Sequence, residues 1–251
     1  MFILGGIMDT VEQYVQEVER LIDAVMQTQR GSIERAAELS AEALCGEGFI
    51  FTFGTGHSHI LAEEIFYRAG GLARVCPILE DSLMLHRGAA ASSMYERAPG
   101  LAGLLLDNVD ALQYGGVLFL FSNSGCNTVA VEMAELAKKR GLKTVCITNI
   151  THSTKMKSRH PAGLKLKDVC DVVIDNCGCY GDAAIPFGEY RAGATSTVIG
   201  SMIMQAIVCR AIELCQAKGI TPELFSSANT LGGDEKNAAH LKKYKPLVKS
   251  L

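Results

Sequence analysis

The chain has 251 residues, of which 48% are apolar and 20% are charged, a composition that excludes a collagen-like or disordered chain. With 24 basic and 27 acidic residues the net charge is −3, so the chain lacks the strongly positive surface that nucleic acids require. No apolar run approaches the roughly 20 residues of a membrane helix, and we expect neither nucleic acid nor membrane as a partner.

Residues 1–7 lack the basic and apolar regions of a secretory signal, so we expect a loose tail or a mis-assigned start over 1–8. A single domain over 9–220 and a C-terminal tail over 221–251 are expected to follow. Most of the nine cysteines lie in apolar runs, which favours reduced, buried thiols and a cytoplasmic location. The closest pair, Cys177 and Cys179, lacks zinc-site spacing, so no metal is expected.

Hydrophobic periodicity predicts the elements in chain order. Residues 9–45 read as two helices that break at Gly31-Ser32 and form an N-terminal helical hairpin. Short apolar runs predict five strands, and helical patterns separate them: Phe49–Phe53, Ala73–Ile78, Val117–Phe121, Lys143–Thr148 and Val172–Asp175. This alternation indicates a doubly wound, mostly parallel α/β sheet with helices on both faces.

The last third of the chain carries one long apolar pattern and a polar end. The pattern from about Ala192 to Gln216 predicts a helix that is either core or a subunit contact. The lysine-rich segment from Gly232 onward is expected to be mobile, or to form a short helix packed on a partner.

Two loops of glycine and small polar residues follow predicted strands, where ligands bind in open α/β sheets. They are Gly54-Thr55-Gly56-His57-Ser58-His59 and Ser122-Asn123-Ser124-Gly125-Cys126-Asn127-Thr128. Each leads into a helix, whose free N–H groups and dipole favour a phosphate. Either loop alone is explained by helix capping, but two at neighbouring strand ends favour an anion site. His59 stands where a dinucleotide fingerprint needs Gly or Ala, and no nucleotide cofactor is expected.

These loops resemble the two phosphosugar-binding loops of sugar isomerase (SIS) domains, and the run from Ala134 to Thr148 is similar to that domain's next helix and strand. Residues 62–71 are most similar to a single-domain bacterial branch related to phosphoheptose isomerases and, more distantly, to N-acetylmuramic acid 6-phosphate etherases. The resemblance covers about residues 10–220. It implies a flavodoxin-like sheet of five parallel strands and a homodimer or tetramer with sites near subunit interfaces.

The resemblance implies phosphate contacts at Ser58, Ser122, Ser124 and the Gly125 backbone. Asn127 departs from the Thr or Ser usual in the family, although its amide can still donate. Together, loop chemistry and resemblance assign the phosphorylated sugar to the following residues: Gly54, Thr55, Gly56, His57, Ser58, Ser122, Asn123, Ser124, Gly125, Asn127 and Thr128.

Isomerisation between aldose and ketose needs a base and an acid. Glu64 or Glu63 is the candidate base, in the first turns of the helix after Ser58, and His59 or His57 is the candidate proton carrier. The alternative is that Glu64 forms an ordinary i,i+4 pair with Arg68.

Several residues outside the two loops are further candidates. Glu96 and His86 are either contributions from a neighbouring subunit or a solvated helix face. Arg191 is expected to bind a second anionic group, and Ser196 to reach the sugar.

The sequence therefore predicts a phosphosugar isomerase that needs no cofactor. Two alternatives stay open: an etherase-like lyase, which also begins by removing a proton beside a carbonyl, and a phosphosugar sensor without catalysis.

Overall fold

A five-stranded sheet organises the computed structural model, which describes residues 8–227 and 232–251; the expectation for residues 1–7 lies outside this range. The strands are β1 (Phe49–Gly54), β2 (Val75–Pro77), β3 (Gly116–Phe121), β4 (Lys143–Thr148) and β5 (Val172–Asp175). They are parallel throughout, in the order β2-β1-β3-β4-β5. The predicted five-stranded α/β fold is confirmed, and the order of strands reverses between β1 and β3, where such sheets bind ligands.

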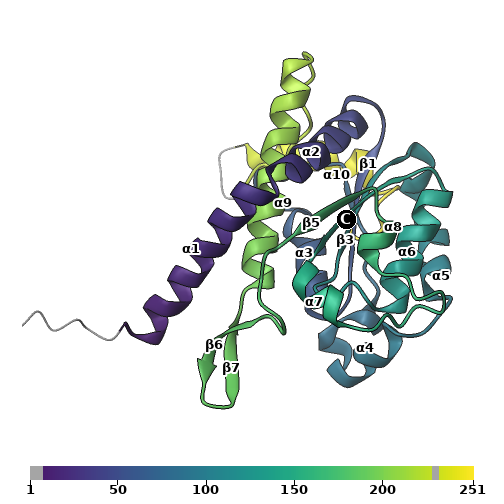
Figure 1. Cartoon of the computed structure of the whole chain (residues 1–251). Coiled ribbons are helices and arrows are strands. Elements are labelled where there is room, and N and C mark those ends of the chain that lie inside the picture. The colour runs from purple at the N-terminus through teal and green to yellow at the C-terminus, as the bar shows by residue number, and fades with distance from the viewer. Residues whose placement is uncertain (1–7, 228–231) are drawn as a thin grey trace, which may run out of the picture.

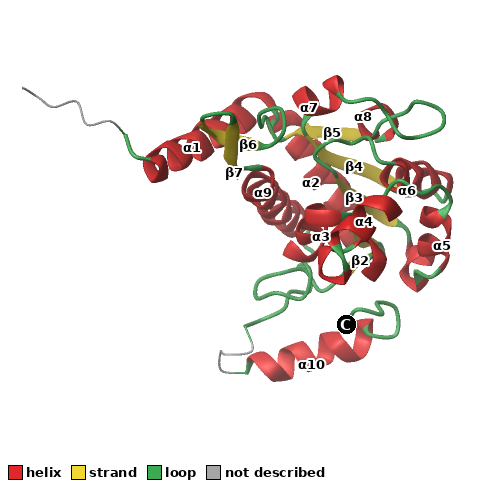
Figure 2. Ribbon diagram, turned by 90° about the horizontal axis from the view of Figure 1, so that it is seen from below, coloured by secondary structure: helices red, strands yellow, loops and turns green. Residues whose placement is uncertain are grey.

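Helices cover both faces of the sheet because its strands are apolar on both faces. One face packs on α2 (Arg30–Cys45), α3 (His59–Glu64) and α9 (Ser196–Ala217). The other packs on α5 (Leu101–Asp107), α6 (Thr128–Lys139) and α8 (Leu166–Val169). Figure 2 shows α9 and α6 on opposite sides of the strands. Further short helices are η1 (Gly56–Ser58), η2 (Asp81–Leu83), η3 (Leu85–Arg87), α4 (Ala89–Tyr95), η4 (Asp110–Tyr114) and α7 (Ile150–Lys155).

The two N-terminal helices are present, but they do not form the expected hairpin. Helix α1 (Thr10–Thr28) begins at Asp9, whose carboxylate accepts the Glu12 N–H, and Gln29 alone joins it to α2. One connecting residue is too short to reverse the chain, so α1 extends away from the sheet (Figure 1). The break falls at Gln29, and Gly31 lies inside α2.

The predicted long helix begins at Ser196, later than expected, because the residues before it pair as strands. β6 (Ala183–Phe187) and β7 (Tyr190–Ala194) form an antiparallel hairpin. Arg210 and Glu213 are the only charged residues of α9. By length and mean hydropathy, 1.7, α9 could cross a membrane, contrary to our expectation, although 44% of its most apolar window is buried inside the chain. One such helix is weak evidence of a membrane span, and α9 packs against α2 as a core helix.

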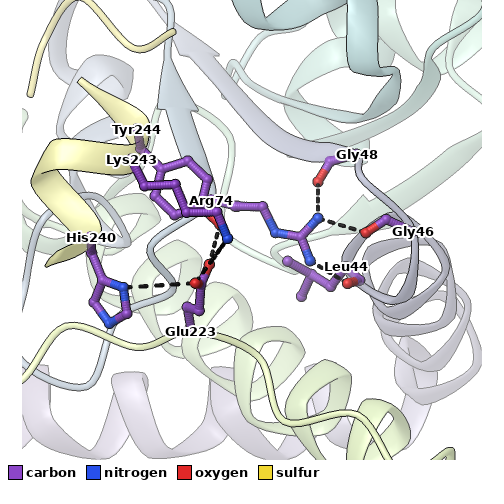
Figure 3. Close-up of polar contacts among 8 residues, drawn as sticks. All are labelled: Leu44, Gly46, Gly48, Arg74, Glu223, His240, Lys243 and Tyr244. Carbon is purple, nitrogen blue, oxygen red and sulfur yellow. Dashed lines mark hydrogen bonds and ion pairs between the residues drawn. The ribbon is translucent and has the colours of Figure 1, made fainter. Parts of the chain in front are cut away.

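The lysine-rich C-terminal segment packs on its own chain. Helix α10 (Gly233–Tyr244) buries Tyr244, whose ring meets the Phe49 ring edge-on at 5.9 Å. Its hydroxyl donates to Glu223, which also accepts from Lys243 Nζ at 2.9 Å (Figure 3). Val248 is completely buried. One of the two alternatives expected a short helix, and this helix is present, but it packs on its own chain.

Candidate functional site

A small cavity lies where β1 and β3 end, and both predicted loops contribute to it. Its volume is about 20 Å³. Four of the residues assigned from the sequence line it: His57, Ser58, Ser122 and Asn123. Its other walls come from Ser196, which we expected to reach the sugar, and from four residues that were not candidates: Leu61, Ile147, Asn176 and Thr197. The structure thus brings together the two serines that follow neighbouring strands.

The first loop is a tight turn held by its own backbone. A Cβ on Gly54 would lie 2.4 Å from the Ser58 carbonyl oxygen, so only glycine fits there. Thr55 does not line the cavity, and its hydroxyl donates to Glu96 Oε2 at 2.8 Å. Glu96 therefore supports the loop from within the same chain. The ring of His59 points back into the turn, where Nδ1 contacts the Gly56 carbonyl oxygen.

The second loop folds around Ser122, which is 7% exposed. The Gly125 N–H, expected to contact phosphate, donates to Ser122 Oγ at 3.1 Å. Gly125 has φ +61°, and an added Cβ would lie 3.1 Å from Thr148 Oγ1, so a larger residue is strained there.

The far end of this loop is engaged with Arg159. Asn127 Oδ1 accepts from Arg159 Nη1 at 2.9 Å, and the Thr128 hydroxyl donates to the Arg159 carbonyl at 3.0 Å. Neither side chain lines the cavity.

The hydroxyl hydrogens at this site are uncommitted. Ser122 Oγ and Ser124 Oγ act only as acceptors in the hydrogen bonds of the described residues, and Ser58 Oγ makes none there. A serine hydroxyl is both donor and acceptor. Ser58 and Ser122 can therefore each donate a hydrogen bond to an anion at the cavity.

Asn176 is a cavity residue that our reasoning from the sequence missed. Its Nδ2 donates to Asn123 Oδ1 at 2.9 Å, and its Oδ1 accepts the Gly178 N–H at 3.0 Å. These bonds hold the Asn123 side chain in one orientation. The amide nitrogen of Asn123 is then left to donate to a ligand. Asn176 directly follows β5, so the strand-end rule that selected Ser58 and Ser122 also points to this residue.

A carboxylate already occupies the N-terminus of α9 beside the cavity. Asp182, which has φ +70°, accepts from the Thr195 and Ser196 N–H groups at 3.1 and 2.9 Å. The Ser196 hydroxyl also donates to Asp182, at 2.6 Å, so it presents lone pairs to the cavity. Arg191 is not at the site: its guanidinium donates to the carbonyls of Ala183 and Ala184. Within one chain the structure does not bring Arg191 to this cavity, and the role we expected for it stays a prediction.

Of the acid–base candidates, His57 lines the cavity, whereas His59, Glu63 and Glu64 do not. α3 ends at Glu64, so Glu63 and Glu64 are in its last turn rather than its first. Glu64 Oε1 contacts Arg68 Nη1 and accepts from Gln205 Nε2 at 3.0 Å. Glu63 is half exposed, 3.8 Å from His59 Nε2. His86 belongs to the same neighbourhood, its ring 6.4 Å from that of His59.

Burial controls two titratable groups near the second loop. Burial lowers the pKa of His152, although the negative charge of Asp182 acts in the opposite direction. Burial also raises the pKa of the Cys126 thiol. The Cys126 thiol therefore stays protonated at neutral pH and is a poor nucleophile. Within residues 8–227 and 232–251, no three His, Cys, Asp or Glu side chains are grouped to hold a metal.

Hydroxyl-lined loops at the switch point of a five-stranded parallel sheet define the class of sugar isomerase domains. The SIS domain model matches residues 13–149, and the chain belongs to this family. A UPF0309 protein of Geobacillus kaustophilus is 41% identical over 240 residues, covering 95% of each chain. Another, of Thermoanaerobacter pseudethanolicus, is 42% identical over 245 residues, covering 95% of this chain and 99% of the relative.

Three solved structures share the fold. A putative phosphosugar isomerase involved in capsule formation, from Bacteroides fragilis, has a TM-score of 0.56 at 22% identity and covers 91% of this chain and 100% of its own. A phosphoheptose isomerase from Francisella tularensis has a TM-score of 0.53 at 15% identity, covering 83% and 97%. The E. coli CFT073 protein c3406, solved in complex with a phosphosugar, has a TM-score of 0.50 at 16% identity, covering 85% and 95%.

Proposed function

We propose that this protein binds a phosphorylated sugar and isomerises it between aldose and ketose, without a metal or nucleotide cofactor. The observation that carries the proposal is the shared cavity, at which Ser58 and Ser122 each have a hydroxyl hydrogen free to donate. Two proteins with this fold are named as phosphosugar or phosphoheptose isomerases, and a third was solved with a bound phosphosugar. The nine cysteines, all free thiols, support a reducing compartment such as the cytoplasm.

In this proposal the phosphate sits at the mouth of the cavity. A volume of about 20 Å³ holds little more than one water, so the sugar extends beyond it. Hydroxyls of Ser58, Ser122 and Ser124 and the amide of Asn123 donate to the phosphate oxygens. The first turn of α6 adds a favourable dipole. A sugar hydroxyl at the other wall donates to the lone pairs of Ser196.

Glu64 is our candidate for the base that moves the proton between neighbouring carbons. Its ion pair with Arg68 and its hydrogen bond from Gln205 fix the carboxylate, and its side chain is 25% exposed, so substrate can reach it. His59 or His57 would carry the proton for ring opening. Glu63 is the alternative base, but no hydrogen bond of the described residues fixes its carboxylate.

We further propose that the protein is a homodimer or tetramer with its site near the interface. Helix α1 projects from the domain with apolar residues uncovered: Val11 is 70% exposed and Val15 48%. On α9, Val198 is 43% exposed. A second copy that covers α1 and α9 would bury this surface. Light scattering of the purified protein measures the mass, and a monomer would contradict this proposal.

Binding without catalysis is the second candidate function. It is favoured by one observation: among the described residues that line the cavity there is no carboxylate. A sensor needs the phosphate loops alone, whereas an isomerase must bring a base to the sugar.

Thermal unfolding of the protein against sugar phosphates and their unphosphorylated parents tests the proposal. Ligand at 100 times its dissociation constant adds about 2.7 kcal/mol to the unfolding free energy and raises the midpoint. NMR of the stabilised mixture in D₂O then detects isomerisation and deuterium uptake. Glu64→Gln should bind the sugar phosphate normally but not isomerise it. Glu38→Gln, on the exposed surface of α2, should bind and isomerise the sugar phosphate as the wild type does. Binding without product in the wild type selects the sensor, and no binding overturns both.

A further inference from the structure

A second and larger cavity lies at the opposite end of the sheet from the serine loops. Its volume is about 570 Å³. Strand β1 enters it at its first residue, Phe49, and the segments preceding β2 and β3 supply Arg74 and Tyr114. Residues 220–223 and the end of α10 close the other side. No residue lines both this cavity and the one at Ser122.

Two charged groups in this cavity have capacity left for a ligand. Arg74 donates from Nη1 to the carbonyls of Gly46, at 2.7 Å, and Gly48, at 3.1 Å, and from Nη2 to that of Leu44 (Figure 3). A guanidinium has five N–H donors, so Nε–H and one Nη2–H stay uncommitted among the described residues. Glu47 is exposed and makes no ion pair or hydrogen bond there.

The other charged pair in the cavity is already satisfied. Lys243 Nζ lies 2.9 and 3.1 Å from the two Glu223 carboxylate oxygens, and the Tyr244 hydroxyl donates to the same carboxylate. The available groups are therefore one guanidinium edge and one carboxylate. A guanidinium edge matches a carboxylate with two parallel hydrogen bonds, and the Glu47 carboxylate matches an ammonium.

The net charge and the rings narrow the class of ligand. Two bases and two acids line the cavity, so a dianionic phosphate would meet two carboxylates, whereas a zwitterion is neutral overall. The Phe49 ring meets Tyr114 at a 48° tilt and Tyr244 edge-on, each at 5.9 Å. These rings leave no parallel gap between them for a flat base. Phe49 and Tyr244 are buried, but Tyr114 is exposed and forms with Ile220 and Leu247 an apolar wall for a side chain.

We propose that this cavity binds a free α-amino acid with a large apolar side chain. Its carboxylate lies against the Nε and Nη2 edge of Arg74, its ammonium faces Glu47, and its side chain contacts the exposed Tyr114 ring and Ile220. Since α10 forms one wall, the bound amino acid holds the C-terminal helix in place. This site is independent of the phosphosugar proposal, and either one can fail alone.

Calorimetric titration of the full-length protein with phenylalanine and leucine tests the site. We expect saturable binding of at least one, and at least tenfold weaker binding of glycine, 3-phenylpropionate and phenethylamine, which lack the side chain, the ammonium or the carboxylate. Arg74→Gln should weaken amino-acid binding at least tenfold, whereas Arg35→Gln, on exposed α2 surface, should leave it unchanged.

Arg74 also holds the end of α2, so Arg74→Gln can lose stability for that reason alone. Glu47→Gln and Tyr114→Leu change exposed residues of the cavity, so they test amino-acid binding without this structural effect. Glu47→Gln should weaken phenylalanine several-fold and leave 3-phenylpropionate unchanged. Absence of saturable binding in folded wild-type protein overturns the proposal. Equal affinity for phenylalanine and 3-phenylpropionate also overturns the proposal. So does binding of a nucleotide that is lost in Arg74→Gln. Ser122→Ala should not affect amino-acid binding.

Discussion

The two ends of the sheet differ in what builds their cavities. At the carboxyl ends of the strands, nine residues enclose about 20 Å³, and most of the polar ones are Ser, Thr or Asn. At the amino ends, a cavity of about 570 Å³ is lined by rings and four charged side chains. The first is made by residues that directly follow strands or begin helices, whereas the second depends on residues 220–223 and α10 docking from the far end of the chain.

Because the two cavities are built differently, mutations in them should have different consequences for binding and for stability. Local turns fix the serine cavity, so a single side chain there controls binding with little effect on the fold. The charged cavity exists only while α10 is docked, so its residues also contribute to stability. Variants at the two ends should therefore affect different measurements.

The largest expected effect is on phosphosugar binding by Ser122→Ala. The variant removes a hydroxyl that donates to the phosphate and accepts the Gly125 N–H. Loss of a hydrogen bond to a charged group costs about 1–3 kcal/mol, so affinity should fall about 5- to 150-fold in a calorimetric titration. Ser40→Ala, which removes a buried hydroxyl inside α2, is the matched control and should bind normally. Unchanged affinity in Ser122→Ala would show that the phosphate lies elsewhere.

At the other end, Glu223→Gln should lower stability without changing phosphosugar affinity. The carboxylate accepts from Lys243 and Tyr244, and a neutral amide weakens both bonds, at a cost of about 1–2 kcal/mol measured by urea unfolding. Glu213→Gln, in an exposed pair with Arg210, should cost less. A variant as stable as the wild type would show that this cluster does not hold α10.

The same variant has a pH signature. Burial alone would raise the pKa of Glu223, but hydrogen bonds from Tyr244 and Lys243 outweigh it and the pKa falls below 4.5. A carboxylate with a lowered pKa stabilises the fold above pH 4.5 and loses that contribution as pH falls through the folded-state pKa. The stability gap between wild type and Glu223→Gln should therefore close below pH 4.5. A gap that does not shrink as the pH falls below 4.5 would contradict the assignment.

Reasoning from the sequence succeeded where local chemistry decides the structure. Uninterrupted apolar runs predicted all five strands, and the glycine and serine loops after two of them led to Ser58 and Ser122. It failed where distant segments meet. Nothing near Tyr244 shows that its ring packs on Phe49. The hairpin of β6 and β7 is different, because it is local: Gly188 and Glu189 form a two-residue loop between the paired Phe187 and Tyr190, and our reasoning from the sequence missed this turn signal. Helix periodicity likewise cannot tell that Gln29 is too short a link for a hairpin.

Asp182 predicts which sugar derivatives the cavity at Ser58 and Ser122 prefers. Its carboxylate uses the donors at the start of α9 and disfavours a second anionic group there. We expect an aldose phosphate to bind better than the aldonate phosphate of equal length. Asp182→Ala should narrow this preference several-fold, because the two N–H groups and two hydroxyls of Thr195 and Ser196 become free to donate. Asp168→Ala, which removes the carboxylate at the start of α8, is the control. An unchanged preference would show that the sugar does not approach α9.

The smallest expected effect concerns His152, which lies behind the same turn. Its Nδ1 accepts the Gly181 N–H at 3.3 Å, and its ring stacks at a tilt on Tyr180. Burial lowers its pKa below 6.5 against the opposing charge of Asp182. The folded state therefore favours the neutral His152 ring. Its contribution to the free energy of unfolding is present above pH 6.5 and is lost as the pH falls toward the folded-state pKa.

His152→Asn should remove this pH dependence of stability, which amounts to a change in Tm on the order of 1 °C between pH 7.5 and 5.5. Lys157→Gln, at an exposed position, is the control, and an identical pH profile for His152→Asn and wild type would show that His152 is protonated equally in both folding states.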